Sequence, residues 1–173
     1  MKNKYLIIII IILGFHSSLG AQNDDELVTI YLVRHSEKDL LSNDHSDPPL
    51  SKCGEQRSES LSVFLREVNL DVIYSTDYNR TRKTALPTAL SKGLIIKKYN
   101  SQQLEEFSKS LINNKQDVLV VGHSNTTAVL AGLLVGKELE AFDLDIYDRI
   151  YQVVISKNAS QINLLYSTFV CTD

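Results

Sequence analysis

Short apolar runs alternate with longer stretches of helical periodicity through most of this 173-residue chain. The runs are rich in Val, Ile and Leu and end abruptly in polar residues, as buried strands do, while the stretches between them repeat apolar residues every three or four positions. Strands that alternate with helices pair in parallel, because each helix carries the chain back to the same end of the sheet. The pattern therefore predicts an α/β fold of three layers, with helices on both faces of a mainly parallel central sheet.

The boundaries of these elements follow from turn residues and caps. We expect parallel strands at residues 27–33, 71–74, 94–96 and 117–121, and helices at 51–68, 78–90, 101–114 and 126–134. Pro87 is expected to limit the regularity of the second helix. Two more strands, at 149–155 and 161–166, flank a Lys157-Asn158 turn and predict an antiparallel edge near the C-terminus.

The first 22 residues have the layout of an export signal and are left out of the fold. Lys2 and Lys4 precede the unbroken apolar run 5–15, and small residues follow it at 17, 18, 20 and 21. A membrane anchor is the alternative, but the run is about half of the roughly 20 residues that a spanning helix needs. We therefore expect a cleaved signal peptide at 1–22, one domain at 23–173, a periplasmic or secreted location, and no stable membrane insertion after cleavage.

Composition narrows the partners and cofactors. A net charge of -3 and a pI near 5.8 argue against the clustered basic excess of a nucleic-acid-binding protein, so no nucleic-acid partner is expected. Cys53 and Cys171 have no metal-ligand spacing, and no cofactor or metal is expected. In an exported protein the two cysteines either pair or stay free, and the sequence leaves this open, as it does the oligomeric state.

Three polar clusters follow the predicted strands. They comprise residues 34–38 after the first strand, 75–82 after the second and 123–126 after the fourth. The carboxyl ends of parallel strands form the ligand crevice of an open α/β sheet. The three clusters are therefore expected to meet in one crevice.

The side chains in these clusters suit a phosphoryl group. An arginine fork binds phosphoryl oxygens bidentately, and a neutral imidazole attacks phosphorus and carries the group covalently, so Arg34 and His35 supply both functions. Each residue alone has an ordinary structural explanation: a strand-end histidine is commonly a hydrogen-bonded structural residue, and Arg80 or Arg82 would lie on the solvated face of a helix. Their joint occurrence after successive strands favours a phosphate site.

Four segments also resemble a known family. The segment Tyr31-Leu-Val-Arg-His-Ser-Glu-Lys38 resembles the nucleophile motif of the histidine phosphatase superfamily, in which the usual core is Arg-His-Gly and Ser36 replaces the glycine. Residues 49–57 resemble the Leu-Ser/Thr-x-x-Gly segment that opens the first helix, 73–85 the Ser-x-x-x-x-Arg-x-x-x-Thr-Ala block, and 118–125 the segment of the second catalytic histidine.

This resemblance implies a phosphoglycerate mutase-like fold and a role for each matched residue. By it, His35 accepts the phosphoryl group, Arg34 and Arg80 clamp the phosphoryl oxygens, and His123 stabilises the developing charge. Ser124 joins Arg34, Arg80 and His123 as a substrate-binding residue, and Arg82 is the alternative to Arg80. No metal takes part.

The proton donor has no clear match. Larger family members supply an acid after the third strand or directly after the second histidine, where this chain has Asn100 and Ser124-Asn125. The remaining candidates are Glu37, Glu105 and Glu106, with the loop acids Asp44 and Asp47 as further possibilities. Without a strong acid, substrates with good leaving groups are favoured, such as phosphohistidine, acyl phosphates and aryl phosphates, and the small phosphohistidine phosphatases are similar in this respect.

The sequence therefore predicts a metal-independent phosphatase that acts on a small phosphorylated substrate or a phosphoprotein through a phosphohistidine on His35. A non-catalytic phospholigand-binding module with a degenerate phosphatase pocket is the main alternative. A phosphoglycerate mutase is less favoured, because that enzyme usually carries a larger lid and this chain has little spare length.

Overall fold

The computed structural model describes residues 27–171, so the expected signal peptide lies outside the described residues. Six strands form one sheet in the order β3-β2-β4-β1-β5-β6. Their bounds are β1 Val28–Arg34, β2 Val72–Ser75, β3 Ile96–Lys98, β4 Val118–Gly122, β5 Arg149–Ile155 and β6 Ser160–Tyr166. The first four pair in parallel, whereas β5 and β6 are antiparallel. The predicted sheet is thereby confirmed, including its antiparallel edge.

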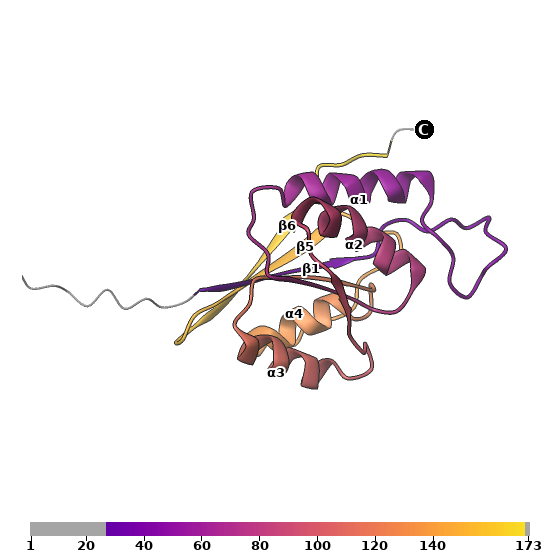
Figure 1. Cartoon of the computed structure of the whole chain (residues 1–173). Coiled ribbons are helices and arrows are strands. Elements are labelled where there is room, and N and C mark those ends of the chain that lie inside the picture. Colours follow the sequence, from indigo (N-terminus) through magenta and orange to yellow (C-terminus); the bar gives the residue numbers. More distant parts are fainter. Residues whose placement is uncertain (1–26, 172–173) are drawn as a thin grey trace, which may run out of the picture.

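Helices cover both faces of the sheet, as predicted (Figure 1). They are α1 Lys52–Phe64, α2 Asn79–Lys92, α3 Leu104–Asn114 and α4 Thr127–Val135. The side chains of β1 alternate between the two layers: Ile30 and Leu32 pack into the core beneath α3 and α4, and Tyr31 and Val33 into the core beneath α1 and α2. Because β1 is buried on both faces, it reads in sequence as a continuous apolar run.

Three boundaries differ from the sequence prediction. Helix α1 ends at Phe64 rather than near Val68, and Phe64 itself is 46% exposed although Leu61, one turn earlier, is buried. Strand β3 is displaced towards the C-terminus and begins at Ile96. Helix α2 continues through Pro87 to Lys92, since neighbouring side chains on its inner face are buried and tertiary packing outweighs the missing hydrogen bond.

The start of α1 packs directly on the loop that follows β1. Ser51 caps the helix by accepting a hydrogen bond from the Gly54 amide, and its own amide donates to the carbonyl of Glu37. Gly54 lies so close to this carbonyl that a Cβ atom would collide with it. The loop residues 35–38, called the nucleophile loop below, are therefore held against the first turn of α1.

A disulfide ties the C-terminal segment to the same helix. Cys53 and Cys171 are bonded across 118 residues of sequence, with their Cα atoms 5.5 Å apart. The C-terminal segment runs along the outside of α1 (Figure 1), where the Arg57 guanidinium lies 4.9 Å from the centre of the Phe169 ring. The pairing that the sequence left open is thus present in the structure.

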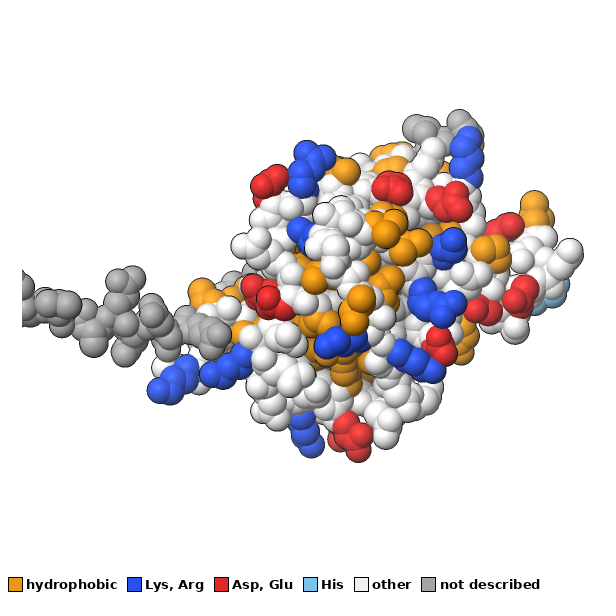
Figure 2. Space-filling view, in the orientation of Figure 1, with side chains coloured by type: hydrophobic (Ala, Val, Ile, Leu, Met, Phe, Trp, Pro, Cys, Tyr) orange, Lys and Arg blue, Asp and Glu red, His pale blue; other side chains and the backbone are white. Residues whose placement is uncertain are grey.

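On the face seen in Figure 2, basic and acidic side chains are interspersed around a central apolar area, so neither sign of charge dominates. Exposed Leu86, Leu90 and Ile95 lie on α2 and just before β3. Across residues 27–171, no helix has the length and apolar character needed to cross a membrane.

Reduction of the disulfide is expected to destabilise the domain. Closing a loop of this length restricts the unfolded chain, and losing such a bond typically costs about 2–5 kcal/mol. We therefore expect the melting temperature to fall by about 5–15 °C on adding a thiol reductant, measured by circular dichroism. The double variant Cys53→Ser/Cys171→Ser should have a melting temperature close to that of the reduced wild type, and the reductant should not change it. Equal melting temperatures for oxidised and reduced wild type would contradict the expectation.

Candidate active site

The parallel pairing of β1 with β4 brings the two predicted catalytic histidines together. In the register of these strands Arg34 lies opposite Gly122, and the His35 amide donates to the Gly122 carbonyl at 2.9 Å. His35 and His123 therefore leave adjacent strand ends side by side, with ring centroids 5.4 Å apart.

His35 is held as a neutral imidazole. It is 5% exposed, and burial lowers the pKa of its ring to about 3; the charges of Arg34 and Arg80 act in the same direction, and the Ser36 carbonyl opposes them. Nδ1 lies 2.7 Å from the Ser36 carbonyl, which only accepts hydrogen bonds, so Nδ1 carries the proton. The lone pair is consequently on Nε2, the nitrogen that would attack phosphorus.

A chain of hydroxyl groups sets the tautomer of His123. The Thr81 hydroxyl donates to backbone carbonyls, so it accepts the proton of the Thr76 hydroxyl. The Thr76 oxygen, 3.0 Å from Nε2 of His123, is therefore left to accept a hydrogen bond from that nitrogen, which carries the proton. Nδ1 is left with a lone pair and donates to a phosphoryl oxygen only after it gains a proton.

The charge state of His123 depends on its surroundings. Partial burial lowers the pKa of this ring to about 4, with contributions from Arg80 and Arg34, while Asp47 opposes the shift. A phosphoryl dianion entering the pocket would favour the protonated form, because an opposite charge nearby stabilises it. Charge stabilisation by His123 would then begin with ligand binding.

Of the two candidate arginines on α2, Arg80 lies in the pocket. Its guanidinium stacks over the Tyr78 ring at 4.3 Å and donates to Asp47 at 3.3 Å. Arg82 instead pairs with Asp77 at the surface, where its side chain is 59% exposed, and it does not line the pocket. The geometry thus favours Arg80 over the alternative.

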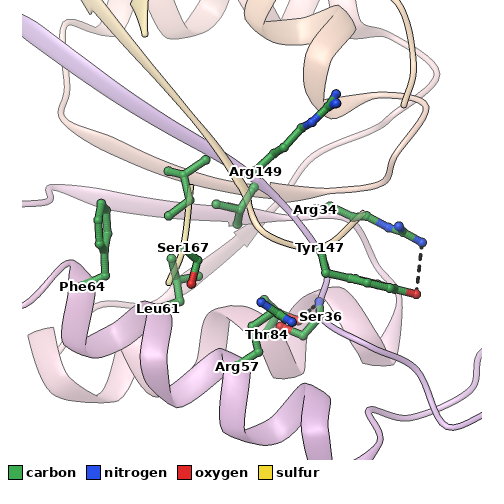
Figure 3. A pocket seen from close by; sticks show the side chains of 11 residues that line it. Arg34, Ser36, Arg57, Leu61, Phe64, Thr84, Tyr147, Arg149 and Ser167 are labelled. Atoms are coloured by element: carbon green, nitrogen blue, oxygen red, sulfur yellow. Dashed lines mark hydrogen bonds between the residues drawn. The ribbon is translucent and has the colours of Figure 1, made fainter. Parts of the chain in front are cut away.

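Arg34 is engaged in a way that the sequence did not indicate. Its Nη1 donates to the carbonyls of Leu144 and Ile146 at 2.7 and 3.0 Å, and Nη2 to the Tyr147 hydroxyl at 3.3 Å. The guanidinium also stacks on the Tyr147 ring at 4.0 Å, and Figure 3 shows the two side chains pointing to the same side. Arg34 lines the pocket, but several of its N–H groups already donate to the 143–147 loop. Arg34 and Arg80 therefore do not offer equivalent sets of free donors to a phosphoryl group. No polar motif marks this loop in the sequence.

A small cavity of about 20 Å³ lies beside the end of β1 (Figure 3). Arg34, Ser36, Arg57, Thr84 and residues of β5 line it, and the buried Nε of Arg34 has no protein partner. The Ser36 amide donates to the Thr84 hydroxyl at 2.9 Å, which joins the nucleophile loop to α2. This volume admits one water-sized group and no substrate.

Glu37, Glu105 and Glu106, the first three of the five proton-donor candidates, lie outside the pocket, and the loop acids Asp44 and Asp47 do not line it either. The Glu37 carboxylate forms a fork with Arg57 on α1, with contacts of 2.6–2.9 Å. Glu105 and Glu106 line a neighbouring hollow between α3 and α4, of about 470 Å³, which shares only Ser101 and Gln102 with the pocket. These positions argue against direct proton transfer by any of the three.

The pocket itself has a volume of about 480 Å³, within the usual range for small-molecule sites. Its lining residues are Arg34, His35, Lys38, Tyr78, Arg80, Ser101, Gln102, His123, Ser124, Asn125, Thr126 and Leu144. Three of these side chains are cationic and none is a carboxylate. Lys38 and Tyr78 lie within predicted clusters yet were not singled out, because a rim lysine and an aromatic residue have no distinctive spacing. Across residues 27–171, no group of three or more metal-ligating side chains could hold a metal ion.

Comparison with known proteins agrees with this geometry. The sequence model described as histidine phosphatase superfamily (branch 1) matches residues 30–110, which span the nucleophile loop and the Arg80 segment. Over these residues the chain is similar to the histidine phosphatase superfamily. No curated protein sequence matches the chain significantly.

Solved structures of the superfamily share its fold at low sequence identity. The alpha-ribazole phosphatase from Shigella flexneri superimposes with a TM-score of 0.67 at 16% identity, covering 84% of this chain and 100% of that one. The protein histidine phosphatase SixA, complexed with tungstate, gives 0.68 at 17% identity over 81% and 97%. Mycobacterial glucosyl-3-phosphoglycerate phosphatase gives 0.67 at 12% identity over 82% and 100%. The predicted phosphoglycerate mutase-like fold is therefore confirmed.

The depressed histidine pKa values predict acid destabilisation in a defined window. Both rings have folded pKa values, about 3 and about 4, below the ordinary value of 6.5, so the unfolded chain binds more protons as the pH falls below 6.5. The contribution of these histidines to the free energy of unfolding should be fully present above pH 6.5. It should decrease towards pH 4, by at most about 1.4 kcal/mol per pH unit for each histidine. Urea unfolding at pH 5–7 measures this slope.

The matched variants separate these histidines from other titrating groups. His35→Asn/His123→Asn should flatten the slope between pH 5 and 6.5, whereas His45→Asn, which removes an exposed imidazole from the 39–47 loop, should leave it as in the wild type. Identical slopes in the wild type and the double variant would show that burial does not control these groups.

Proposed function

We propose that the chain is a metal-independent phosphatase that forms a phosphohistidine on His35. The observation that carries the proposal is the state of this ring: buried, neutral, and with its Nε2 lone pair free because Nδ1 donates to the Ser36 carbonyl. An imidazole in this state is a nucleophile without prior deprotonation. Arg80 and His123 line the same pocket, where positive charge would offset that of a phosphoryl group.

The reaction proceeds in two displacements. In the first, Nε2 forms a bond to phosphorus while the bond from phosphorus to the leaving atom breaks, and that atom, an oxygen or the nitrogen of a phosphohistidine, departs with the electron pair. The Ser36 carbonyl stabilises the cationic phosphoimidazole by accepting a hydrogen bond from Nδ1–H. In the second, water attacks phosphorus, the bond to Nε2 breaks, and a proton passes from the water to solvent as inorganic phosphate leaves.

The pocket lining favours substrates that need little protonation of the leaving group. None of its described residues is a carboxylate, and a well-placed general acid typically contributes about 10²–10⁴-fold to such a step. Phosphohistidine, acyl phosphates and aryl phosphates are the classes proposed, on a small molecule or on a phosphoprotein. The volume leaves room for a leaving group beside the phosphoryl group.

A non-catalytic phospholigand-binding module is the second candidate. It is favoured by the partial engagement of Arg34 with the 143–147 loop and by the absence of a carboxylate from the described pocket lining. Vanadate distinguishes the two, because it mimics five-coordinate phosphorus: a catalyst binds it far more tightly than phosphate, and a simple binder does not.

Export is also part of the proposal. The tripartite N-terminal segment supports a signal peptide at 1–22, and the Cys53–Cys171 disulfide fits the oxidising conditions of a periplasmic or extracellular location.

Hydrolysis of an aryl phosphate in excess chelator tests the proposed activity. The protein lacking residues 1–22 should turn over, His35→Ala should have no activity above background because no other group forms the intermediate, and Arg80→Ala should lose about 10²–10³-fold in kcat/KM, as expected for loss of a charged transition-state contact. Arg82→Ala is the matched control and should stay within about twofold. If the wild type binds phosphate yet hydrolyses neither aryl, acyl nor histidine phosphates, the binding module becomes the better account.

The leaving group should control the rate. We expect an alkyl phosphate to react at least about 100-fold more slowly than an aryl phosphate, because the described pocket lining lacks a carboxylic acid to protonate the departing oxygen. A series of aryl phosphates with phenols of increasing acidity should show a steep rise in kcat/KM. A flat series would reveal an efficient proton donor.

A further inference from the structure

Asp47 occupies a special position among the acids near the pocket. It lies at the end of the exposed 39–47 loop, ahead of Pro48 and Pro49, and it reaches across to α2. Both of its carboxylate oxygens accept the Asn79 amide proton, each at 2.9 Å, and Oδ1 also accepts from Nη1 of Arg80 at 3.3 Å. Two donors and the positive end of a helix thus converge on one carboxylate, an arrangement that suits a negative charge.

These contacts argue against Asp47 as a simple substitute for the missing acid. A protonated carboxyl group would lose the negative charge that attracts Arg80. The carboxylate also closes the open end of α2, whose N-cap residue Tyr78 makes no side-chain capping bond. Asp47 does not line the pocket itself, and it reaches the pocket only through its contact with Arg80.

Arg80 is restrained from two sides by this arrangement. The Tyr78 ring lies beneath its guanidinium at 4.3 Å, and Asp47 holds Nη1 from the side. The Arg80 side chain is only 15% exposed, and one donor edge is taken by Asp47 while the remaining donors stay available to the pocket. Tyr78 in turn meets the His123 ring edge-on at 5.1 Å. A long, flexible side chain is thereby oriented before a ligand arrives.

We propose that Asp47 is a positioning residue, which fixes Arg80 in the orientation that receives the phosphoryl group and acts on the reaction only through Arg80. The inference rests on the proposed function for its kinetic consequences, but its central claim concerns phosphoryl binding by Arg80. The Arg80 guanidinium would be oriented by the Asp47 carboxylate before a ligand binds, whereas the Arg34 guanidinium is oriented by backbone carbonyls of the 143–147 loop.

A double-mutant cycle tests the claim, with Asp47→Asn, Arg80→Ala and their combination. Asn keeps an oxygen for the Asn79 amide and removes the charge that holds Arg80. In the wild-type background Asp47→Asn should weaken vanadate binding and lower kcat by about 10–100-fold, with KM changed less than threefold, since misplacing one binding group costs up to about 10²-fold. In the Arg80→Ala background it should change vanadate affinity less than twofold.

Two further variants separate positioning from folding. Asp77→Asn removes a carboxylate just before the start of α2 that pairs only with the surface residues Lys98 and Arg82, and it should leave binding and kcat within twofold. Asp47→Glu keeps the charge and should recover part of the loss seen with Asp47→Asn. Thermal melts of all variants show whether each is folded at the assay temperature.

The outcomes are distinguishable from failure of the proposed activity. If the wild type binds vanadate or phosphate without hydrolysis, the proposed function fails, yet the binding cycle still decides the role of Asp47. An equal loss from Asp47→Asn with and without Arg80 would overturn the inference and assign Asp47 a structural role. Tighter phosphate binding by Asp47→Asn would also overturn it, because Asp47 would then compete with the ligand for Arg80.

Discussion

The parallel pairing of β1 with β4 is the interaction on which the site depends. It places Arg34 opposite Gly122, so that His35 and His123 lie at neighbouring strand ends. The His35 amide donates a hydrogen bond to the carbonyl of Gly122, the residue before His123. A shift of one residue in this register would turn one of the two imidazoles towards the opposite face of the sheet. The buried apolar side chains on both faces of β1 and β4 disfavour such a shift, because each would have to pack into the core on the other face of the sheet.

The site combines neutral imidazoles with fixed cations. Burial and neighbouring guanidinium groups both disfavour protonation of His35, which keeps its lone pair available while Arg80 and Lys38 leave the pocket positive. Hydrogen bonds then assign the two rings different tasks, because a carbonyl accepts a hydrogen bond from Nδ1–H of His35 and a threonine hydroxyl oxygen accepts one from Nε2–H of His123. Residues of one chemical type thus acquire distinct roles from the acceptors beside them.

Periodicity and strand-end clusters were sufficient to predict the fold class, the alternation of elements and the meeting of the three polar clusters in one pocket. Ser101, Gln102 and Leu144 also line this pocket, and they lie outside those clusters. Local sequence fails where a tertiary contact decides: Phe64 has the spacing of a core residue but lies at the edge of the α1 layer, and α2 tolerates Pro87 because its inner face is packed. The partners of Arg34 and Arg80 could not be predicted either. Carbonyls of the 143–147 loop have no sequence signature, and Asp47 is separated from Arg80 by 33 residues.

The contact between Gly54 and the Glu37 carbonyl has a consequence for variation in this chain. Even a methyl group at position 54 would push the first turn of α1 away from the nucleophile loop, and with it Ser51, which bonds to the same carbonyl. In a library of random substitutions, position 54 should therefore accept no other amino acid in active clones, although Gly54 does not line the pocket. Tolerance to mutation along α1 would follow contact with the nucleophile loop rather than contact with a ligand.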